Sequence, residues 1–262
     1  DSFIDYLRGG EQINTIIAID FTGSNGEPSN PNSLHAKNAP GGNQYQQAIR
    51  AVSEILLNYD YDQKVPMYGF GAIRGLGTSH CFKLHESKKE TGLDGIMRTY
   101  EKTLKNVTLS GPTYFHEVIA KAMKKAERHK KKETGVYTIL LILTDGCIDD
   151  MDKTIELIVK AALLPLSIII VGVGNNDFAG MHILDGDNGL KDSKGNVAQR
   201  DLVQFVPFQE VKGDPKALAQ AVLAEIPKQI VDYNKLVDRK PRPPKPFDIS
   251  KLSLPEDQLP QE

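Results

Sequence analysis

Short apolar runs rich in β-branched residues alternate along the chain with longer segments of helical periodicity, and this alternation constrains the fold most strongly. Residues 13–20 predict a buried strand, and residues 43–58 predict the helix that follows it. Further strands are predicted at 65–71, 79–84, 137–144, 166–173 and 202–207, and further helices at 93–106, 113–129, 151–163 and 214–237. The pattern predicts an α/β fold with a doubly wound (Rossmann-like), mainly parallel sheet, one antiparallel strand, and helices on both faces.

Proline and charge set the expected organisation of the chain. Residues 239–262 hold 6 of the 15 prolines, so we expect one domain at residues 1–238 and a Pro-rich tail at 239–262. Lys and Arg number 32 against 34 Asp and Glu, and this near-neutral balance argues against nucleic acid as a partner. The longest mostly apolar run, residues 161–174, falls short of the about 20 residues of a membrane-spanning helix.

Oxygen-bearing side chains follow the predicted strands at three points. Asp20, Thr22 and Ser24 come at the end of the first strand, Thr113 follows a Ser-Gly-Pro turn, and Asp145 ends the strand at 137–144. In an open α/β sheet, ligands bind outside the carboxyl ends of the strands, so these side chains are candidates for one site. Carboxylates and hydroxyls without His or Cys suit Mg²⁺ or another hard divalent cation better than zinc.

The same positions carry a family resemblance. The pattern Asp-x-Ser-x-Ser, with a Thr in a second loop and an Asp in a third, is the metal-ion-dependent adhesion site of von Willebrand factor A domains, and this chain differs only in Thr22 for the first Ser. More specifically, the chain resembles the A domain of copines. The matching segments are residues 9–14, 20–26, 68–71, 111–113, 143–146, 169–174, 200–207 and 223–227.

The resemblance implies a non-catalytic interaction domain that binds Mg²⁺ or Mn²⁺. Ser24, Thr22 and Thr113 are expected nearest the metal, with Asp20 and Asp145 acting directly or through water, and an Asp or Glu of an intracellular protein partner completing the coordination. Copines also have two calcium-dependent phospholipid-binding domains ahead of the A domain. We therefore expect a fragment of a longer cytoplasmic protein, whose membrane contact is made through those lipid-binding domains.

Two other functions compete with this interpretation. Residues 20–24 also resemble the nucleophile loop of ion-pumping ATPases and related phosphatases, in which Asp20 would form an aspartyl phosphate. Phe21 replaces the Lys of the ATPase motif, and Thr22 stands where the phosphatases carry a second Asp, so a general acid is missing. The other competitor is a purely structural A domain whose metal site is empty.

Other chemically suggestive residues have a structural interpretation. Asp149, Asp150 and Asp152 are expected to cap and charge the helix at 151–163, the alternative being that they add negative potential around the metal. Cys147 is expected to be a small buried residue. Residues 185–189 resemble part of a calcium loop but lack its twelfth-position Glu and its correct third ligand, and a hairpin or surface loop is predicted. A run of cations is expected to be the solvated end of the helix at 113–129, the alternative being contact with an anionic membrane surface or an acidic partner. Its members are Lys121, Lys124, Lys125, Arg128, Lys130, Lys131 and Lys132.

Overall fold

The main sheet of the computed structural model, which describes residues 1–84, 90–186 and 189–244, has six strands in the order β11-β10-β9-β1-β3-β6. Neighbouring strands are parallel except β3 and β6, which are antiparallel. The strands are β1 (Gln12–Asp20), β3 (Met67–Phe70), β6 (Phe82–Lys83), β9 (Val136–Thr144), β10 (Leu166–Gly172) and β11 (Val203–Pro207). The predicted mainly parallel sheet with one antiparallel strand is confirmed.

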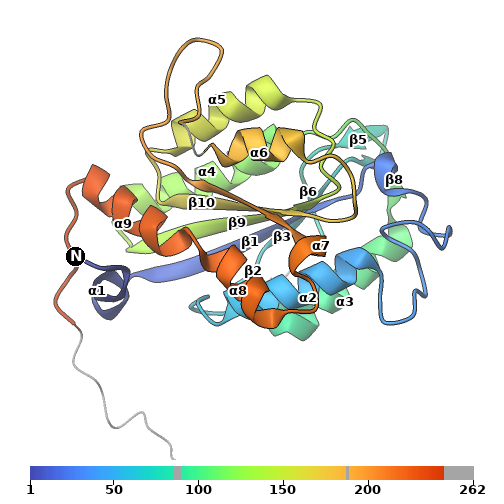
Figure 1. The fold of residues 1–262 in the computed structure, drawn as a ribbon, viewed down its shortest axis with the longest axis horizontal. Helices are drawn as coiled ribbons and strands as arrows, with labels where there is room; N and C mark the ends of the chain where they lie inside the picture. Colours follow the sequence, from blue (N-terminus) through green and yellow to red (C-terminus); the bar gives the residue numbers. More distant parts are fainter. Residues whose placement is uncertain (85–89, 187–188, 245–262) are drawn as a thin grey trace, which may run out of the picture.

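Helices cover both faces of this sheet (Figure 1). One face packs against α2 (Gln44–Leu57), α3 (Gly92–Asn106), α8 (Pro215–Leu223) and α9 (Ile226–Leu236). The other face packs against α4 (His116–Lys131), α5 (Met151–Ala161) and α6 (Ala179–Asp185). Every residue of β9 is buried, which explains why its sequence is a continuous apolar run rather than an alternating one.

Shorter elements lie outside the main sheet. They are α1 (Phe3–Arg8), the 3₁₀ turn η1 (Gly23–Asn25), β2 (Lys64–Val65), β4 (Ala72–Arg74), β5 (Gly77–Ser79), β7 (Glu90–Thr91), β8 (Thr108–Leu109) and α7 (Phe208–Val211). The prediction of one strand at 79–84 is wrong. Its first residue ends β5, which pairs with β4 in a second sheet, and the chain bends before β6 joins β3. Local β propensity does not reveal which sheet a strand will join.

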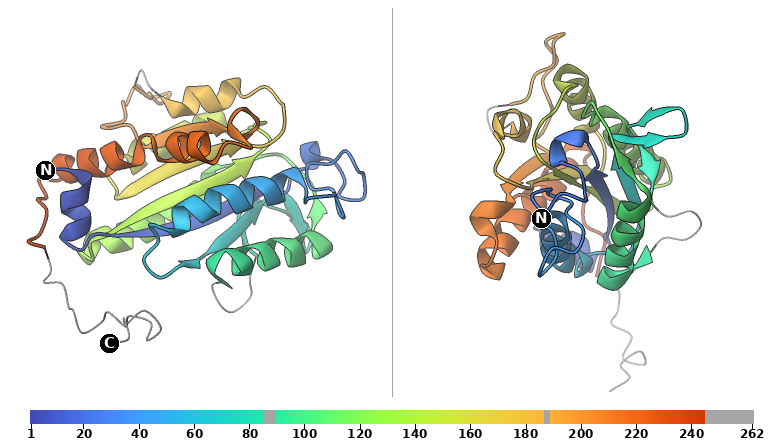
Figure 2. Two further views of the ribbon diagram at one scale, coloured as in Figure 1. Left: turned by 60° about the horizontal axis from the view of Figure 1, so that its bottom comes forward. Right: turned by 90° about the vertical axis from the view of Figure 1, so that its right-hand side faces the viewer.

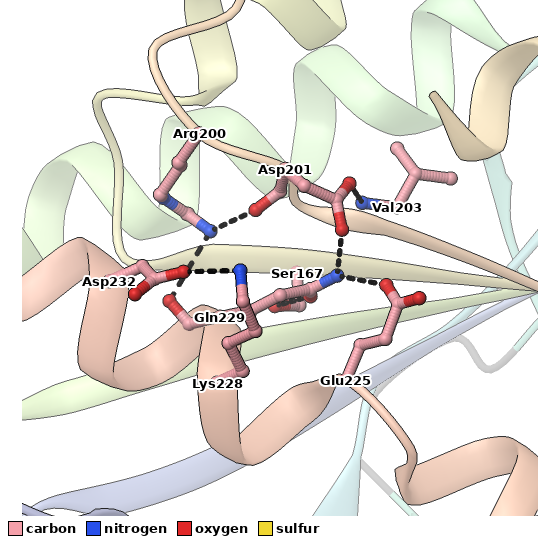
Figure 3. Close-up of polar contacts among 8 residues, drawn as sticks. All are labelled: Ser167, Arg200, Asp201, Val203, Glu225, Lys228, Gln229 and Asp232. Atoms are coloured by element: carbon pink, nitrogen blue, oxygen red, sulfur yellow. Dashed lines mark hydrogen bonds and ion pairs between the residues drawn. The ribbon is translucent and has the colours of Figure 1, made fainter. Parts of the chain in front are cut away.

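The predicted helix at 214–237 is divided, as the proline in it indicates. The division lies between Leu223 and Ile226, so Pro227 falls in the first turn of α9, where a missing backbone N–H costs nothing. Buried polar side chains then fix α9 to the sheet (Figure 3). The Gln229 amide accepts from the Ser167 hydroxyl at 2.6 Å and donates to Asp201 at 3.2 Å. Arg200 donates to the Gln229 carbonyl at 3.5 Å and also to the carbonyls of residues 164 and 166 near the start of β10.

The two ends of the described chain lie beside each other (Figure 2). The Tyr6 hydroxyl donates to the carbonyl of Arg239 at 2.9 Å, and the Arg242 guanidinium donates to the carbonyl of Glu133 at 3.2 Å. The first residues of the predicted tail therefore contact the domain. Among the described helices, none is both long and apolar enough to cross a membrane.

Candidate functional site

The candidate site lies at the carboxyl edge of the sheet, where β1 and β9 end side by side. The register pairs Ile19 with Leu143, and the next residues, Asp20 and Thr144, are the last of β1 and β9. Gly71 follows β3 at a φ of +75°, and a Cβ added there would collide with the Thr22 side chain. Three loops thus meet at this edge because their strands are parallel neighbours.

The first loop gathers three of the predicted ligands. Asp20 Oδ1 accepts from the Thr22 backbone N–H at 2.8 Å and from the Thr22 hydroxyl at 2.6 Å. The hydroxyls of Thr22 and Ser24 are 3.0 Å apart. Asp20 and Thr22 are buried, whereas Ser24 is exposed. The buried Asp20 carboxylate therefore holds the loop in place through Thr22, and the Ser24 side chain reaches the surface.

The loop after β9 places the Asp145 carboxylate near that of Asp20. Burial and the negative charge of Asp145 raise the pKa of Asp20 from its ordinary 3.8 to about 7. The pKa of Asp145 is also raised, mainly by burial, although the Ser24 hydroxyl and the Cys147 backbone N–H act to lower it. Asp145 Oδ2 is buried and has no hydrogen-bond partner among the described residues. Two neighbouring carboxylates buried in this way are unfavourable while both are ionised, and a proton or a cation would relieve their repulsion.

Several residues that sequence reasoning missed support these groups. The Thr144 hydroxyl donates to Asp20 Oδ2 at 2.7 Å, and the Asn25 side chain donates to the Thr22 carbonyl at 3.1 Å. The Tyr45 hydroxyl donates in turn to Asn25 Oδ1 at 2.8 Å. The signal for Thr144 and Asn25 was their place next to predicted ligands, whereas nothing in the sequence connects Tyr45 to the site.

His35 holds the loop after Ser24 against the end of β1. Its Nε2 lies 2.7 Å from the Asp20 carbonyl oxygen, which only accepts, so Nε2 carries the hydrogen and Nδ1 accepts from the Tyr100 hydroxyl at 2.8 Å. The ring also stacks on Tyr45 at 4.0 Å. Burial lowers the pKa of His35 to about 4, so the ring is neutral at physiological pH. No sequence motif marks this residue, because the contact spans a long loop.

The Thr113 loop is tied to the Asp145 loop through two aspartates. The Asp149 carboxylate accepts from the Thr113 backbone N–H at 2.8 Å, and the Asp149 N–H donates to the Thr113 carbonyl at 2.9 Å. Asp150 accepts from the backbone N–H groups of Phe115 and His116, at 3.0 and 2.9 Å. Thr113 is buried next to these contacts, ahead of α4.

This arrangement corrects the interpretation of the aspartates as caps of α5. Asp150 occupies the N-cap position of α5, but its side chain makes no capping bond to that helix and caps α4 instead. Only Asp152 lies in the first turn of α5, as expected. A capping side chain from a distant loop is invisible to a local pattern, because capping motifs are recognised within a few residues of the helix start.

Two further expectations fall near this edge. Cys147 was expected to be buried, but it is exposed, because the turn after Asp145 carries it to the surface. The predicted hairpin or surface loop at residues 185–189 includes residues 187 and 188, which lie outside the described residues. The cationic end of α4 agrees with expectation, since its last turn holds Arg128, Lys130 and Lys131, all exposed.

The donor set fits a hard divalent cation. The five predicted residues offer two carboxylates and three hydroxyls, and Asp145 Oδ2, which has no hydrogen-bond partner among the described residues, offers a free lone pair. Within residues 1–84, 90–186 and 189–244, no group of three or more His, Cys, Asp or Glu side chains is arranged to hold a metal. Any cation at this edge therefore depends on hydroxyl ligands as well as carboxylates.

Comparison with known proteins identifies the family. The copine family model matches residues 33–242. The chain belongs to the copine family. Copine-E of Dictyostelium discoideum is 48% identical over 237 residues, an alignment that covers 89% of this chain and 41% of that protein. This copine chain thus spans less than half the length of that relative.

One solved structure supports the fold at low sequence identity, and a second superposes less well. The crystal structure of manganese-loaded Plasmodium vivax TRAP protein superposes with a TM-score of 0.50 at 15% identity, covering 84% of this chain and 74% of that one. The SpRpn10 VWA domain superposes with a TM-score of 0.45 at 11% identity, covering 65% and 78%. The copine chain has the predicted von Willebrand factor A fold, with its sheet order and antiparallel edge strand.

Proposed function

We propose that this copine domain is a non-catalytic interaction module that binds Mg²⁺ or Mn²⁺ and presents it to an acidic residue of a protein partner. The observation that carries the proposal is the buried pair Asp20 and Asp145, with one Asp145 oxygen lacking a hydrogen-bond partner among the described residues. Burying two adjacent carboxylates is unfavourable unless a cation or a proton compensates their charge. The family relationship and the likeness to a manganese-loaded protein support the same proposal.

Each predicted ligand has a proposed role in this site. Thr22, Ser24 and Thr113 supply hydroxyl ligands, and Asp20 and Asp145 supply negative charge directly or through water. Ser24 is the exposed member of the set, so an incoming carboxylate approaches from its side. The cation supplies positive charge and an open ligand position, because two carboxylates and three hydroxyls leave an octahedral ion incomplete. We place the partner in the cytoplasm with the full-length protein.

Phosphoryl transfer fits the geometry less well. Asp20 Oδ1 accepts a hydrogen bond from Thr22, and Oδ2 accepts one from Thr144. The carboxylate is also fully buried, so it is poorly placed to attack a phosphorus atom. Thr22 occupies the position of the second acidic residue that phosphatases use as general acid. Acyl phosphate hydrolysis that disappears in Asp20→Asn would favour the enzyme over the interaction module.

The proposal is tested by calorimetric titration of the chain with Mg²⁺, Mn²⁺ and Ca²⁺. Wild type is expected to bind Mg²⁺ or Mn²⁺ at one site, and Ser24→Ala is expected to weaken that binding at least tenfold. Ser29→Ala, an exposed serine in the same long loop, is the matched control and should bind like wild type. Lack of binding by all three ions would instead support the structural A domain with an empty site.

The domain boundaries are also a proposal. We assign residues 1–238 to the A domain and 239–262 to a Pro-rich tail, of which residues up to 244 are described. The Arg239 guanidinium Nη1 lies 3.6 Å from Glu11 Oε1. Burial raises the pKa of Glu11, and Arg239 acts to lower it. The tail thus begins against the domain surface. Removing residues 239–262 should lower the melting temperature, because it removes the contacts that Arg239 and Arg242 make with the domain.

A further inference from the structure

The hairpin formed by β4 and β5 carries exposed apolar side chains beside the candidate metal site. Leu76, in the turn between β4 and β5, is fully exposed, and Ile73 on β4 is 46% exposed. The right-hand view of Figure 2 shows the hairpin projecting from the body of the domain. Exposed aliphatic side chains at a projecting turn contribute nothing to the core. Their exposure to water is unfavourable, and contact with an apolar surface of another molecule would remove them from water.

The base of the hairpin is built into the metal-site loops. Thr22 bridges to Ser110, and the Ser110 hydroxyl lies 2.8 Å from the hydroxyl of Thr78 on β5. Gly71, which packs on Thr22, immediately precedes β4. The hairpin is therefore held in a fixed position relative to the Asp20 loop, although its turn is solvent-exposed.

Aromatic rings connect the Thr113 loop to the same hairpin. Tyr114 follows Thr113, and its ring lies 4.4 Å from the ring of His80, the residue after β5. Both side chains are partly exposed. Tyrosine is enriched at the centres of protein interfaces because its ring offers apolar area and its hydroxyl a polar contact. A strip of partly exposed surface thus links Thr113 to the apolar turn.

Charge on the hairpin fits the same kind of partner as the metal. Arg74 is exposed next to the turn, and its guanidinium lies over the Phe82 ring at 5.0 Å, which fixes its position.

The turn is about four residues beyond Gly71, or about 13 Å at the rise of an extended strand. An extended partner segment covers that distance with about four residues.

We propose that the β4–β5 hairpin is the second contact of the partner that binds the metal, and that it receives a large apolar residue. This inference rests on the proposed metal-dependent function. The occupant is an extended acidic segment in which a large apolar residue lies three to five positions from the Asp or Glu that coordinates the cation. The metal recognises the carboxylate, while Leu76 and Ile73 contact the apolar side chain and Arg74 favours negative charge nearby.

Selection from a display library of random peptides with one fixed Asp, carried out on the full chain in Mg²⁺, tests the proposal. With wild type we expect enrichment of Leu, Ile or Phe three to five positions from the Asp. Peptides selected on wild type should bind Leu76→Ser about tenfold more weakly, or about 1.4 kcal/mol, and Leu163→Ser, an exposed leucine near the opposite edge, unchanged. Leu76→Ser should bind Mg²⁺ like wild type.

The outcomes separate this inference from the proposed function. Enrichment that depends on Mg²⁺ and Asp but shows no apolar preference refutes the hairpin contact alone, as does equal binding of the selected peptides by wild type and Leu76→Ser. If no peptide is retained in a Mg²⁺-dependent way, both the metal-dependent function and the hairpin contact are refuted.

Discussion

Replacing Asp20 by Asn is expected to stabilise the metal-free protein while abolishing its response to Mg²⁺. The Asn side chain keeps an acceptor for the Thr22 N–H and gains a donor toward Thr144, so it approximates the shape and bonding of a protonated Asp20. It removes one of two negative charges that lie buried together at the ends of β1 and β9. The two effects of one substitution therefore have opposite signs, which a simple loss of structure does not produce.

The magnitude follows from the pKa of Asp20, which rises from 3.8 to about 7 in the folded protein. Each unit corresponds to about 1.36 kcal/mol, so ionised Asp20 costs the folded state on the order of 4 kcal/mol above pH 7. Between pH 4 and 7 the folded state binds the proton and the unfolded state does not. Without metal, the stability of wild type therefore falls as pH rises through this range, and the advantage of Asp20→Asn grows from near zero to its full value.

Urea unfolding in chelator and in Mg²⁺, at several pH values between 4 and 8, measures both effects. At a Mg²⁺ concentration 100 times the dissociation constant, wild type should gain about 2.7 kcal/mol and Asp20→Asn almost nothing. Asp152→Asn, which removes an exposed carboxylate at the start of α5, should follow wild type throughout. A variant that is less stable than wild type at pH 8 without metal, or a difference independent of pH, would refute the buried-charge reasoning.

Three further substitutions test how the site is held. Gly71→Ala should lower stability by at least 1 kcal/mol and weaken Mg²⁺ binding in calorimetry, because φ is +75° and the new Cβ displaces Thr22; normal Mg²⁺ affinity would show that the contact is unimportant. Asp150→Ala should cost about 1–2 kcal/mol in urea unfolding, since two N–H groups at the start of α4 lose their acceptor, and a neutral result would contradict its capping role. Arg200→Met should cost about 3 kcal/mol or more, because buried carbonyls lose a charged donor; a smaller loss would mean that water replaces the guanidinium.

Much of the fold was predictable because the sheet is buried on both faces. Continuous apolar runs such as the one in β9 arise only where helices cover both sides of a strand, and the helices that alternate with them fix a parallel connection. The break before α9 was predictable from Pro227, although its position was shifted. The division of residues 79–84 between two sheets was not predictable, since β5 and β6 differ in their partners and not in their local composition.

The candidate site was predictable where its members follow strand ends. Asp20, Thr22 and Ser24 share one loop, and the parallel pairing of β1 and β9 brings Asp145 beside them. The metal-binding role of these residues and of Thr113 stays a prediction. The contribution of His35 was not predictable, because its contact with the end of β1 depends on how the loop after Ser24 returns to the sheet.

The sequence by itself determined the layered α/β architecture and the edge at which polar side chains gather, because the apolar periodicity and the alternation of strands with helices are local properties of the chain. Only the tertiary structure decided which of these polar groups are buried and which hydrogen bonds they make. It buried two carboxylates together, left one Asp145 oxygen without a partner among the described residues, and turned Asp150 from its own helix toward α4. These outcomes depend on distances between segments far apart in the chain, and burial converts those distances into large electrostatic energies.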